Sequence, residues 1–263
     1  MEHTDYRGKR VVVTGSSSGI GAAVAGALSE AGAQVHGAAL QGSADGLASF
    51  TVVDLADPAS ITAAADAIGG PVDALFNCAG ATPLIDPVEL LKINFLGTRL
   101  FTESLVPLMT EGSAIVNVSS DGGFGWRQKR ALLTEFVGLP TFDAGVEWYW
   151  EHQEQAGHSY SFGKEALDVW TMQQSAVLIG RGIRINAVSP GAVQTPMLDA
   201  IAATFPAEMI DAVTHPIGRR STPAEQVGPI LFLGSDAASY VNGIDLQVDG
   251  GYWAARSVAG QLD

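Results

Sequence analysis

The sequence is poor in cysteine and in positive charge, and each shortage excludes a class of protein. Cys78 is the single cysteine among 263 residues, so an internal disulfide is excluded and a cysteine-based metal cluster is not expected. Lysine and arginine total 14 against 28 aspartate and glutamate residues, which gives a net charge of −14. That charge argues against nucleic acid or an anionic membrane surface as a partner. Because the five histidines are scattered, we predict no metal site.

Long apolar runs are also missing. No run approaches the roughly 18 residues that span a membrane. Residues 1–10 are polar and charged and lack the pattern of a signal peptide, so we predict a cytoplasmic protein with no membrane partner. Apolar residues nevertheless make up 47% of the chain and glycine is abundant at 31, which suits a sizeable core with many tight turns. We predict one α/β domain over residues 1–263, without repeats or linkers.

A nucleotide-binding unit is predicted near the start of the chain. Residues 10–14 form a β-branched run typical of a buried strand, and residues 20–31 show apolar spacing typical of a helix. The glycines between them let the backbone turn tightly and approach a pyrophosphate at the helix N-terminus. The loop has the spacing Gly-x-x-x-Gly-x-Gly, and we predict cofactor contacts from Gly15, Ser17, Ser18, Gly19, Ile20 and Gly21.

The end of the predicted second strand, residues 34–40, bears on the choice of cofactor. An acidic residue there would hold the ribose 2′-hydroxyl of NAD, but residues 38–43 contain neither an acid nor a lysine or arginine. Ser18 in the glycine loop is not basic either. Since a 2′-phosphate needs charge-assisted partners, the missing cations favour NAD, with NADP not excluded.

Three further strand ends supply candidate cofactor contacts. The strand at 50–55 ends in Asp54 and Leu55, where the carboxylate either meets the adenine amino group or faces solvent. The strand at 73–77 is followed by small residues that allow a cofactor to lie against backbone, with candidates Asn77, Ala79 and Gly80. We interpret Cys78 as a small apolar residue there.

Two polar positions are candidates for the chemistry. The strand at 113–120 ends in two hydroxyls, and ligands of open parallel sheets bind at that carboxyl edge, which makes Ser120 a candidate. Asn94 lies within a predicted helix that starts at Asp86 and Pro87, and an asparagine inside a helix is usually solvent-facing or functional.

Tyr160 and Lys164 are four residues apart, a spacing that stacks two side chains on one helical face. A tyrosine has a pKa of about 10, and a neighbouring ammonium favours the phenolate. The pair is therefore a candidate general base. The spacing alone is weak evidence, because Tyr252 and Arg256 have it too.

Several motifs, taken together, resemble one enzyme family. They are Thr14 to Gly21, Asp54 with Leu55, Asn77 to Gly80, Asn94, Asn117 to Ser120, Tyr160 with Lys164, and Pro190-Gly191 followed by Thr195. In this order, and along nearly the whole chain, they resemble the short-chain dehydrogenase/reductase family. The resemblance implies a single Rossmann-type, doubly wound sheet of seven parallel strands with helices on both faces. One mild departure is Cys78, where asparagine is commoner.

The resemblance also implies roles for the candidate residues. Tyr160 would take the hydroxyl proton of a secondary alcohol while hydride leaves for the cofactor, and Ser120 would donate to the substrate oxygen. Lys164 would lower the tyrosine pKa and reach the nicotinamide ribose, and Asn94 would hold a water that links Lys164 to solvent. Contacts to the nicotinamide end of the cofactor are implied for Pro190, Gly191, Val193 and Thr195.

A larger departure is the distance between Ser120 and Tyr160, which are 40 residues apart where the family usually places them much closer. This indicates a helical insertion over about 126–158, rich in aromatic residues that must be buried against something. It resembles the branch containing bacterial 3α-hydroxysteroid dehydrogenase/carbonyl reductase and coniferyl-alcohol dehydrogenase, in which a modified oligomer interface is implied. A roof over the active site, a subunit contact and a surface embellishment all stay open.

The segment at about 196–215 is predicted to be an apolar substrate lid, with a plain surface helix as the alternative. We therefore predict an NAD-dependent oxidoreductase of apolar, ring-bearing secondary alcohols or ketones, assembled as a homodimer or homotetramer. Aryl and terpene alcohols fit the same site. A catalytically silent nucleotide-binding protein and a methyltransferase on a similar sheet are the rival classes.

Overall fold

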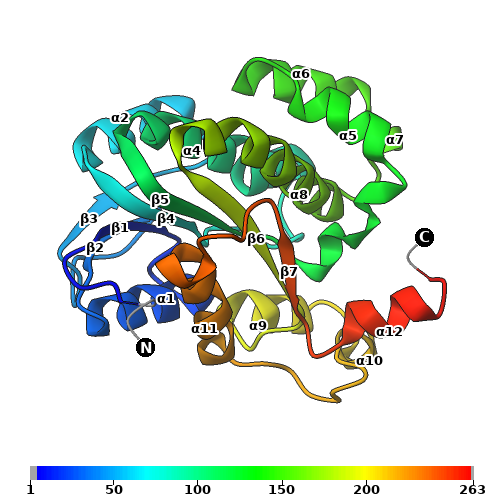
Figure 1. The fold of residues 1–263 in the computed structure, drawn as a ribbon. Helices are drawn as coiled ribbons and strands as arrows, with labels where there is room; N and C mark the ends of the chain where they lie inside the picture. The colour runs from blue at the N-terminus through cyan, green and yellow to red at the C-terminus, as the bar shows by residue number, and fades with distance from the viewer. Residues whose placement is uncertain (1–4, 262–263) are drawn as a thin grey trace.

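The centre of the molecule is a sheet of seven parallel strands in the order β3-β2-β1-β4-β5-β6-β7 (Figure 1). The computed structural model describes residues 5–261. The strands are β1 (Arg10–Thr14), β2 (Gln34–Ala39), β3 (Ser49–Val52), β4 (Val72–Asn77), β5 (Met109–Val118), β6 (Arg184–Pro190) and β7 (Asp245–Val248). The predicted doubly wound α/β fold is confirmed.

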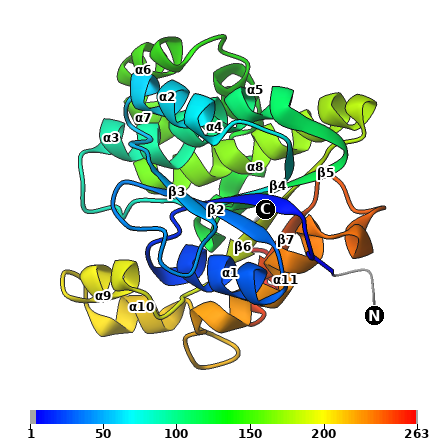
Figure 2. The same cartoon turned by 90° about the vertical axis from the view of Figure 1, so that its left-hand side faces the viewer.

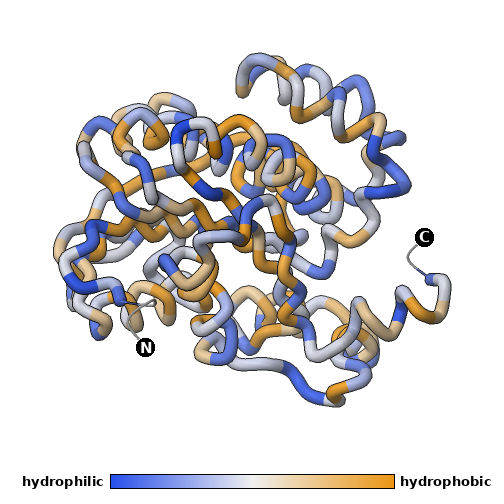
Figure 3. The backbone as a smooth tube through the Cα atoms, in the orientation of Figure 1, coloured by the Kyte–Doolittle hydropathy of each residue, from blue (hydrophilic) through white to orange (hydrophobic). Residues whose placement is uncertain are grey.

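Helices cover both faces of this sheet, as the two views in Figures 1 and 2 agree. One face carries α2 (Pro58–Ile68), α3 (Pro87–Leu91), α4 (Thr98–Leu105), α5 (Arg130–Val137), α6 (Phe142–Glu151), α7 (Gln153–Ala156) and α8 (Ser159–Leu178). The other carries α1 (Gly19–Glu30), α9 (Pro196–Ala202), α10 (Ala207–Ala212), α11 (Pro223–Gly234) and α12 (Tyr252–Val258). Each face therefore has its own apolar core, and Figure 3 shows the hydrophobic residues concentrated along the inner strands.

Short helical turns complete the chain. A π-helical turn, η1 (Lys92–Gly97), joins α3 to α4. The 3₁₀ turns are η2 (Val106–Leu108), η3 (Asp121–Arg127), η4 (Ile179–Arg181) and η5 (Asp236–Ala238). Within residues 5–261, no helix has both the length and the apolarity that crossing a membrane requires. The cytoplasmic location stays a prediction.

The order of strands positions the site. From β1 the chain builds outward to β2 and β3, then returns to place β4 against the other side of β1. Thr14 at the end of β1 pairs with Asn77 at the end of β4. In open parallel sheets a ligand crevice forms outside the carboxyl ends of strands where the order reverses. The glycine loop and the segment after Asn77 both start at that point.

The insertion packs against the outer side of α8 through an aromatic cluster. Phe136 of α5 lies 5.0 Å, centre to centre, from both Trp148 of α6 and Phe162 of α8. The predicted burial is confirmed for Phe136, Trp148 and Tyr149. It is wrong for Trp150, which is 60% exposed. Residues two apart on a helix do not share a face, so α6 turns Trp150 outward when it buries Trp148.

The segment predicted as a lid consists of two short helices, α9 and α10, joined by residues 203–206. Pro206 directly precedes α10. Proline has no backbone N–H and is disfavoured inside a helix, which accounts for the break.

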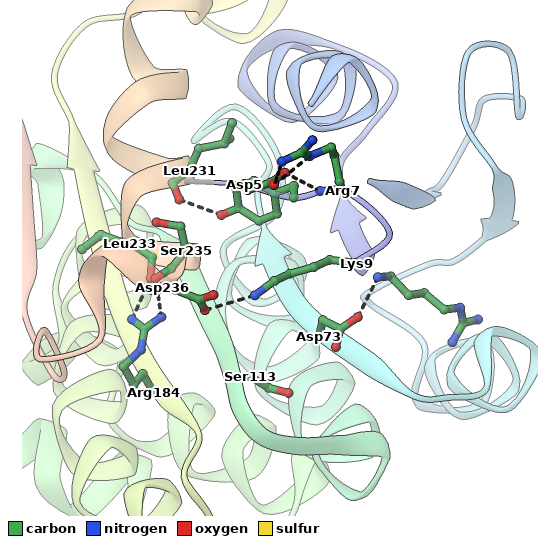
Figure 4. A network of polar contacts seen from close by, with 12 residues as sticks. Asp5, Arg7, Lys9, Asp73, Ser113, Arg184, Leu231, Leu233, Ser235 and Asp236 are labelled. Carbon is green, nitrogen blue, oxygen red and sulfur yellow. Dashed lines mark hydrogen bonds and ion pairs between the residues drawn. The ribbon is translucent and has the colours of Figure 1, made fainter. Parts of the chain in front are cut away.

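The amino ends of the strands are held by a polar network on the far side of the sheet (Figure 4). The Arg184 guanidinium donates to the carbonyls of Leu233 and Ser235, at 2.9 and 2.8 Å. The Tyr6 hydroxyl donates to the Leu231 carbonyl at 2.6 Å. Leu231 and Leu233 belong to the last turn of α11, whose carbonyls have no partner within the helix. These bonds anchor the C-terminal end of α11 at the amino edge of the sheet.

Candidate active site

A cavity of about 490 Å³ opens at the carboxyl edge of the sheet. Its walls are the glycine loop, the ends of β4 and β5, the first turn of α8, the turn after β6 and the lid helices. Elements far apart in sequence thus meet around one space that is large enough for small-molecule ligands.

Most of the predicted site residues line this cavity. They are Gly15, Ser18, Gly19, Ile20, Gly21, Ala79, Gly80, Ser120, Tyr160, Lys164, Pro190, Gly191, Val193 and Thr195. Ser17, Asp54, Leu55, Asn77 and Asn94 are not part of its wall. The roles assigned to all of these residues stay predictions.

The glycine loop forms a cradle that side chains would fill. Gly15 has a φ of +66°, and a Cβ on it would lie 2.8 Å from the Ala79 Cα. A Cβ on Gly21 would overlap the Gly15 carbonyl. The backbone therefore approaches the cavity as closely as a pyrophosphate requires, at the N-terminus of α1. This arrangement fits the dinucleotide that the sequence predicts.

Three residues predicted to contact the cofactor have other partners. The Ser17 hydroxyl donates to the Gln41 carbonyl in the loop after β2. Asp54 accepts from the Ala56 amide at 2.8 Å, as a turn residue does. The Leu55 carbonyl lies against Gly97, where a Cβ would overlap it. These contacts give Ser17, Asp54 and Leu55 a structural use that the sequence does not reveal.

Asn77 belongs to a buried amide network that anchors α8. Its side-chain nitrogen donates to Asn117 and to Thr102, both at 2.8 Å. Asn117 in turn donates to Thr171 of α8 at 2.8 Å. All four residues are buried, so the network ties β4, β5, α4 and α8 together beneath the cavity.

Asn94 lies in the π-helical turn η1, where the sequence predicts a continuous helix. Its side-chain oxygen accepts from the Ala81 amide at 2.7 Å, and its nitrogen donates to the Ala81 carbonyl at 3.3 Å. A Cβ on Gly80 would lie 3.4 Å from this oxygen and 3.9 Å from the Lys164 nitrogen. Asn94 thus holds the segment that follows β4 in place beside Lys164. The water that would link Lys164 to solvent stays a prediction.

Lys164 is buried at the inner end of the cavity, with 5% of its surface exposed. Its Nζ donates to the Val118 carbonyl at the end of β5, at 2.9 Å. Burial lowers the pKa of Lys164 to about 8, against the opposing effects of Asp168 and Cys78. The ammonium lies 6.0 Å from the centre of the Tyr160 ring.

Tyr160 behaves differently from the expectation based on spacing. Burial raises the pKa of Tyr160 to about 12, and a hydrogen bond with Ser120 opposes this rise. The nearby Asp121 charge raises the pKa of Tyr160 further, and the expected lowering by Lys164 stays a prediction. The ring also packs closely on Gly122, where a Cβ would lie 3.1 Å from the ring edge.

Ser120 has a neighbour that the sequence reading missed. The Ser120 hydroxyl donates to Asp121 at 2.9 Å and accepts from the Gly122 amide at 3.1 Å. Asp121 lines the cavity, and burial raises its pKa to about 6, against the hydrogen bond from Ser120. Its place directly after the strand-end serine is the signal that could have identified it.

The outer part of the cavity is apolar and is formed by the lid. Met197, Leu198, Ile201, Phe205, Met209, Ile210 and Val213 line it. Of the insertion, only its last residue, His158, reaches the wall. The substrate lid stays a prediction, and apart from His158 the insertion does not line the cavity.

Three residues that the sequence singles out, Cys78, Tyr252 and Arg256, take no part in the proposed chemistry. Burial raises the pKa of the Cys78 thiol to about 12, which keeps it protonated and supports its reading as a packing residue. Tyr252 and Arg256 contact each other at 3.1 Å on α12, and neither lines the cavity. Shared spacing therefore does not make them part of the site.

Asp168 is a further buried carboxyl on α8, one turn after Lys164, with 1% of its surface exposed. Burial and the nearby Asp245 carboxylate raise the pKa of Asp168 well above its ordinary value, against smaller effects of Ser119 and Lys164. Burial and the neighbouring carboxylate thus both favour the neutral form of Asp168.

Comparisons with known proteins agree with the motifs. Family models described as short chain dehydrogenase and as Enoyl-(Acyl carrier protein) reductase match residues 9–131 and 149–253. Coniferyl-alcohol dehydrogenase of Pseudomonas sp. (strain HR199) is 34% identical over 244 residues, which cover 92% of this chain and 96% of that protein. The 3-alpha-hydroxysteroid dehydrogenase/carbonyl reductase of Comamonas testosteroni is 29% identical over 249 residues, 92% and 95% of the two chains. A 3-alpha-hydroxysteroid dehydrogenase from Pseudomonas sp. B-0831, solved with NADH, has a TM-score of 0.80 at 29% identity, with 95% and 99% covered.

The close fit of the glycine loop leads to a paired prediction. Gly21→Ala should weaken NADH binding at least about tenfold and cost about 1–3 kcal/mol of stability, because the new methyl group overlaps the Gly15 carbonyl. Gly26→Ala, on the same helix with open space around it, should instead stabilise by about 0.5–1 kcal/mol. Fluorescence titration with NADH and urea unfolding measure both effects. Equal NADH affinity in the two variants would contradict the cradle.

The buried carboxyl of Asp168 predicts a pH-dependent stability. Its raised pKa means that the folded protein keeps a proton that the unfolded chain releases, so stability falls as pH rises above the ordinary carboxyl pKa of about 3.9. Asp168→Asn has no such proton and should gain stability relative to the wild type between about pH 4 and pH 8. Urea unfolding at both pH values measures this, with exposed Asp199→Asn as control. Parallel behaviour of Asp168→Asn and wild type would argue against a neutral buried carboxyl.

Proposed function

The chain belongs to the short-chain dehydrogenase/reductase family, and from that premise we propose that it interconverts an apolar, ring-bearing secondary alcohol and its ketone. As a member of this family it is a nicotinamide-dependent oxidoreductase that acts on alcohols. The finer substrate class and the roles of individual residues are the proposal.

One observation carries this proposal. Ser120, Tyr160 and Lys164 line the same cavity as the glycine loop, and the part of the cavity beyond them is walled by apolar lid residues. A polar reacting end and an apolar body are the features of a cyclic or aromatic alcohol. Two relatives described above, a coniferyl-alcohol dehydrogenase and a 3-alpha-hydroxysteroid dehydrogenase, support a substrate of this class.

In the proposed reaction, Tyr160 exchanges a proton with the substrate oxygen. When bound, the nicotinamide ring accepts hydride in alcohol oxidation and supplies it in ketone reduction. The Ser120 hydroxyl stabilises charge that develops on the substrate oxygen. The glycine loop would hold the pyrophosphate, and the turn at Pro190 to Thr195 would contact the nicotinamide end.

The pKa values of Tyr160 and Lys164 bear on how Tyr160 could transfer a proton in each direction of the reaction. A pKa of about 12 leaves Tyr160 a phenol at neutral pH, a form that can protonate the oxygen of a ketone. In the direction of oxidation, the hydrogen bond with Ser120 favours the phenolate, and we propose that the Lys164 ammonium, 6.0 Å from the ring centre, does so too. Lys164 keeps most of its charge near pH 7 because its pKa is about 8.

The rival classes fit the site less well. A catalytically silent protein has no need of a tyrosine, a serine and a lysine that meet in one cavity with the glycine loop. A methyltransferase gives the Tyr160–Lys164 pair no task. We retain aryl and terpene alcohols as substrates for the same cavity, and a homodimer or homotetramer as the assembly.

Removal of the proposed proton donor is the direct test. Tyr160→Phe should lower turnover at least about 100-fold across a panel of cyclic and aromatic alcohols, because proton transfer is lost while the ring is kept. Its affinity for NADH should be unchanged. Tyr252→Phe, the tyrosine of the pair on α12, should retain full turnover. Near-normal activity of Tyr160→Phe would end the assignment.

Cofactor preference is tested at the end of β2. Residues 38–54 contain no lysine or arginine, so a 2′-phosphate finds no charge-assisted partner there. We expect NADH to bind at least about tenfold more tightly than NADPH in fluorescence titrations. Leu40→Arg, at an exposed position just beyond β2, should shift the preference toward NADPH. Tighter binding of NADPH by the wild type would reverse the assignment of NAD.

A further inference from the structure

Asp121 is the only carboxylate among the residues that line the active-site cavity. It follows Ser120 directly and begins the turn η3, so it stands beside the proposed reacting end of the cavity. No cation forms an ion pair with it in residues 5–261. A carboxylate in a largely apolar cavity, without a counter-charge, has to be satisfied by hydrogen-bond donors.

The protein supplies only part of what this carboxylate can accept. Its Oδ1 accepts from the Ser120 hydroxyl at 2.9 Å, and the Gly122 amide also contributes. An ionised carboxylate has about four acceptor positions. Acceptor capacity therefore remains, next to the group that would hold the substrate oxygen.

We propose that Asp121 determines specificity by accepting a hydrogen bond from a second hydroxyl on the substrate, so that the preferred substrates are neutral ring-bearing vicinal diols. The proposal rests on the proposed function and names its substrate class. In oxidation, the first carbinol carbon would lose hydride to the oxidised cofactor, and its hydroxyl would lose a proton to the phenolate form of Tyr160. The second hydroxyl stays intact, and the product is an α-hydroxyketone.

The geometry selects adjacent hydroxyls. Ser120 lies between Asp121 and the reacting oxygen: its hydroxyl donates to Asp121 at 2.9 Å, and on substrate binding its one proton would turn to the reacting oxygen, about 2.8 Å away, and leave that position on Asp121 to another donor. The Asp121 carboxylate and the reacting oxygen would then both lie within hydrogen-bond distance of the Ser120 hydroxyl, on different sides of it. An oxygen on the next carbon is itself about 2.8 Å from the reacting one and bridges that gap to Asp121.

The same carboxylate acts against anionic substrates. A carboxylate or phosphate on the substrate next to the reacting carbon would meet a like charge at Asp121 in a largely apolar cavity. Lys164, the cation of the cavity wall, is bound to the Val118 carbonyl and lies on the cofactor side of Tyr160 in the proposed arrangement. Neutral diols are therefore favoured over hydroxy acids as well as over simple alcohols.

The test compares two alcohols that differ in one hydroxyl, indan-1-ol and the isomers of indane-1,2-diol. Wild-type kcat/KM should be about 10- to 100-fold higher for the preferred diol isomer, the usual effect of a hydrogen bond to a charged group. Asp121→Ala should bring this ratio close to one, chiefly through loss of the diol. Asp121→Asn keeps one acceptor oxygen and should fall between the two.

Asp199→Ala is the control, because it removes an exposed carboxylate of α9 that does not line the cavity, and it should keep the wild-type ratio. Calorimetric titration of both alcohols into Tyr160→Phe saturated with NAD gives a readout without turnover, and there Asp121→Ala should weaken only the diol. Equal use of the two alcohols by the wild type, or a ratio unchanged in Asp121→Ala, would overturn the role of Asp121 and leave the proposed function intact. Turnover of neither alcohol, nor of any in the panel, would overturn both.

Discussion

A buried ammonium group is the constraint on which the site depends. Lys164 has 5% of its surface exposed, and its Nζ is bound to the Val118 carbonyl at the end of β5. Burying a charge without an ion pair is costly in free energy. The Val118 carbonyl dipole offsets part of this cost for the Lys164 ammonium, and burial lowers the pKa of Lys164 to about 8. Because that carbonyl belongs to the sheet, the first turn of α8 is fixed against the strand ends, and Tyr160 is fixed with it.

The rest of the structure supports this attachment from several sides. The buried network of Asn77, Asn117 and Thr171 holds α8 further along its length. The aromatic insertion packs on the outer side of α8 at Phe162 and leaves the cavity to the lid. The insertion packs on the helix that carries Tyr160 and Lys164, and the predicted lid supplies the apolar part of the cavity wall.

Much of this was predictable from local patterns. β-branched runs, glycine spacing and helix starts such as Asp86 before Pro87 predict the strands and helices, and the strand ends bring most of the predicted site residues to one edge. What could not be predicted depends on contacts between distant segments. The sequence predicts Asn77 as a cofactor contact, but its side chain donates hydrogen bonds to two buried residues of the core. The tyrosine pKa follows from burial, which the four-residue spacing does not reveal. Asp121 acquires its meaning only when Ser120 is seen to donate to it.

The central claim is that Tyr160 and Ser120 jointly hold the reacting oxygen beside a cofactor cradled by the glycine loop. A crystal structure of the complex with reduced cofactor and an unreactive ketone analogue tests it most directly. The account predicts the carbonyl oxygen within hydrogen-bond distance of both hydroxyls, with the pyrophosphate against Gly15 to Gly21 and the ring among the lid residues. A well-ordered analogue whose carbonyl contacts neither hydroxyl, or a cofactor bound away from the loop, would contradict it.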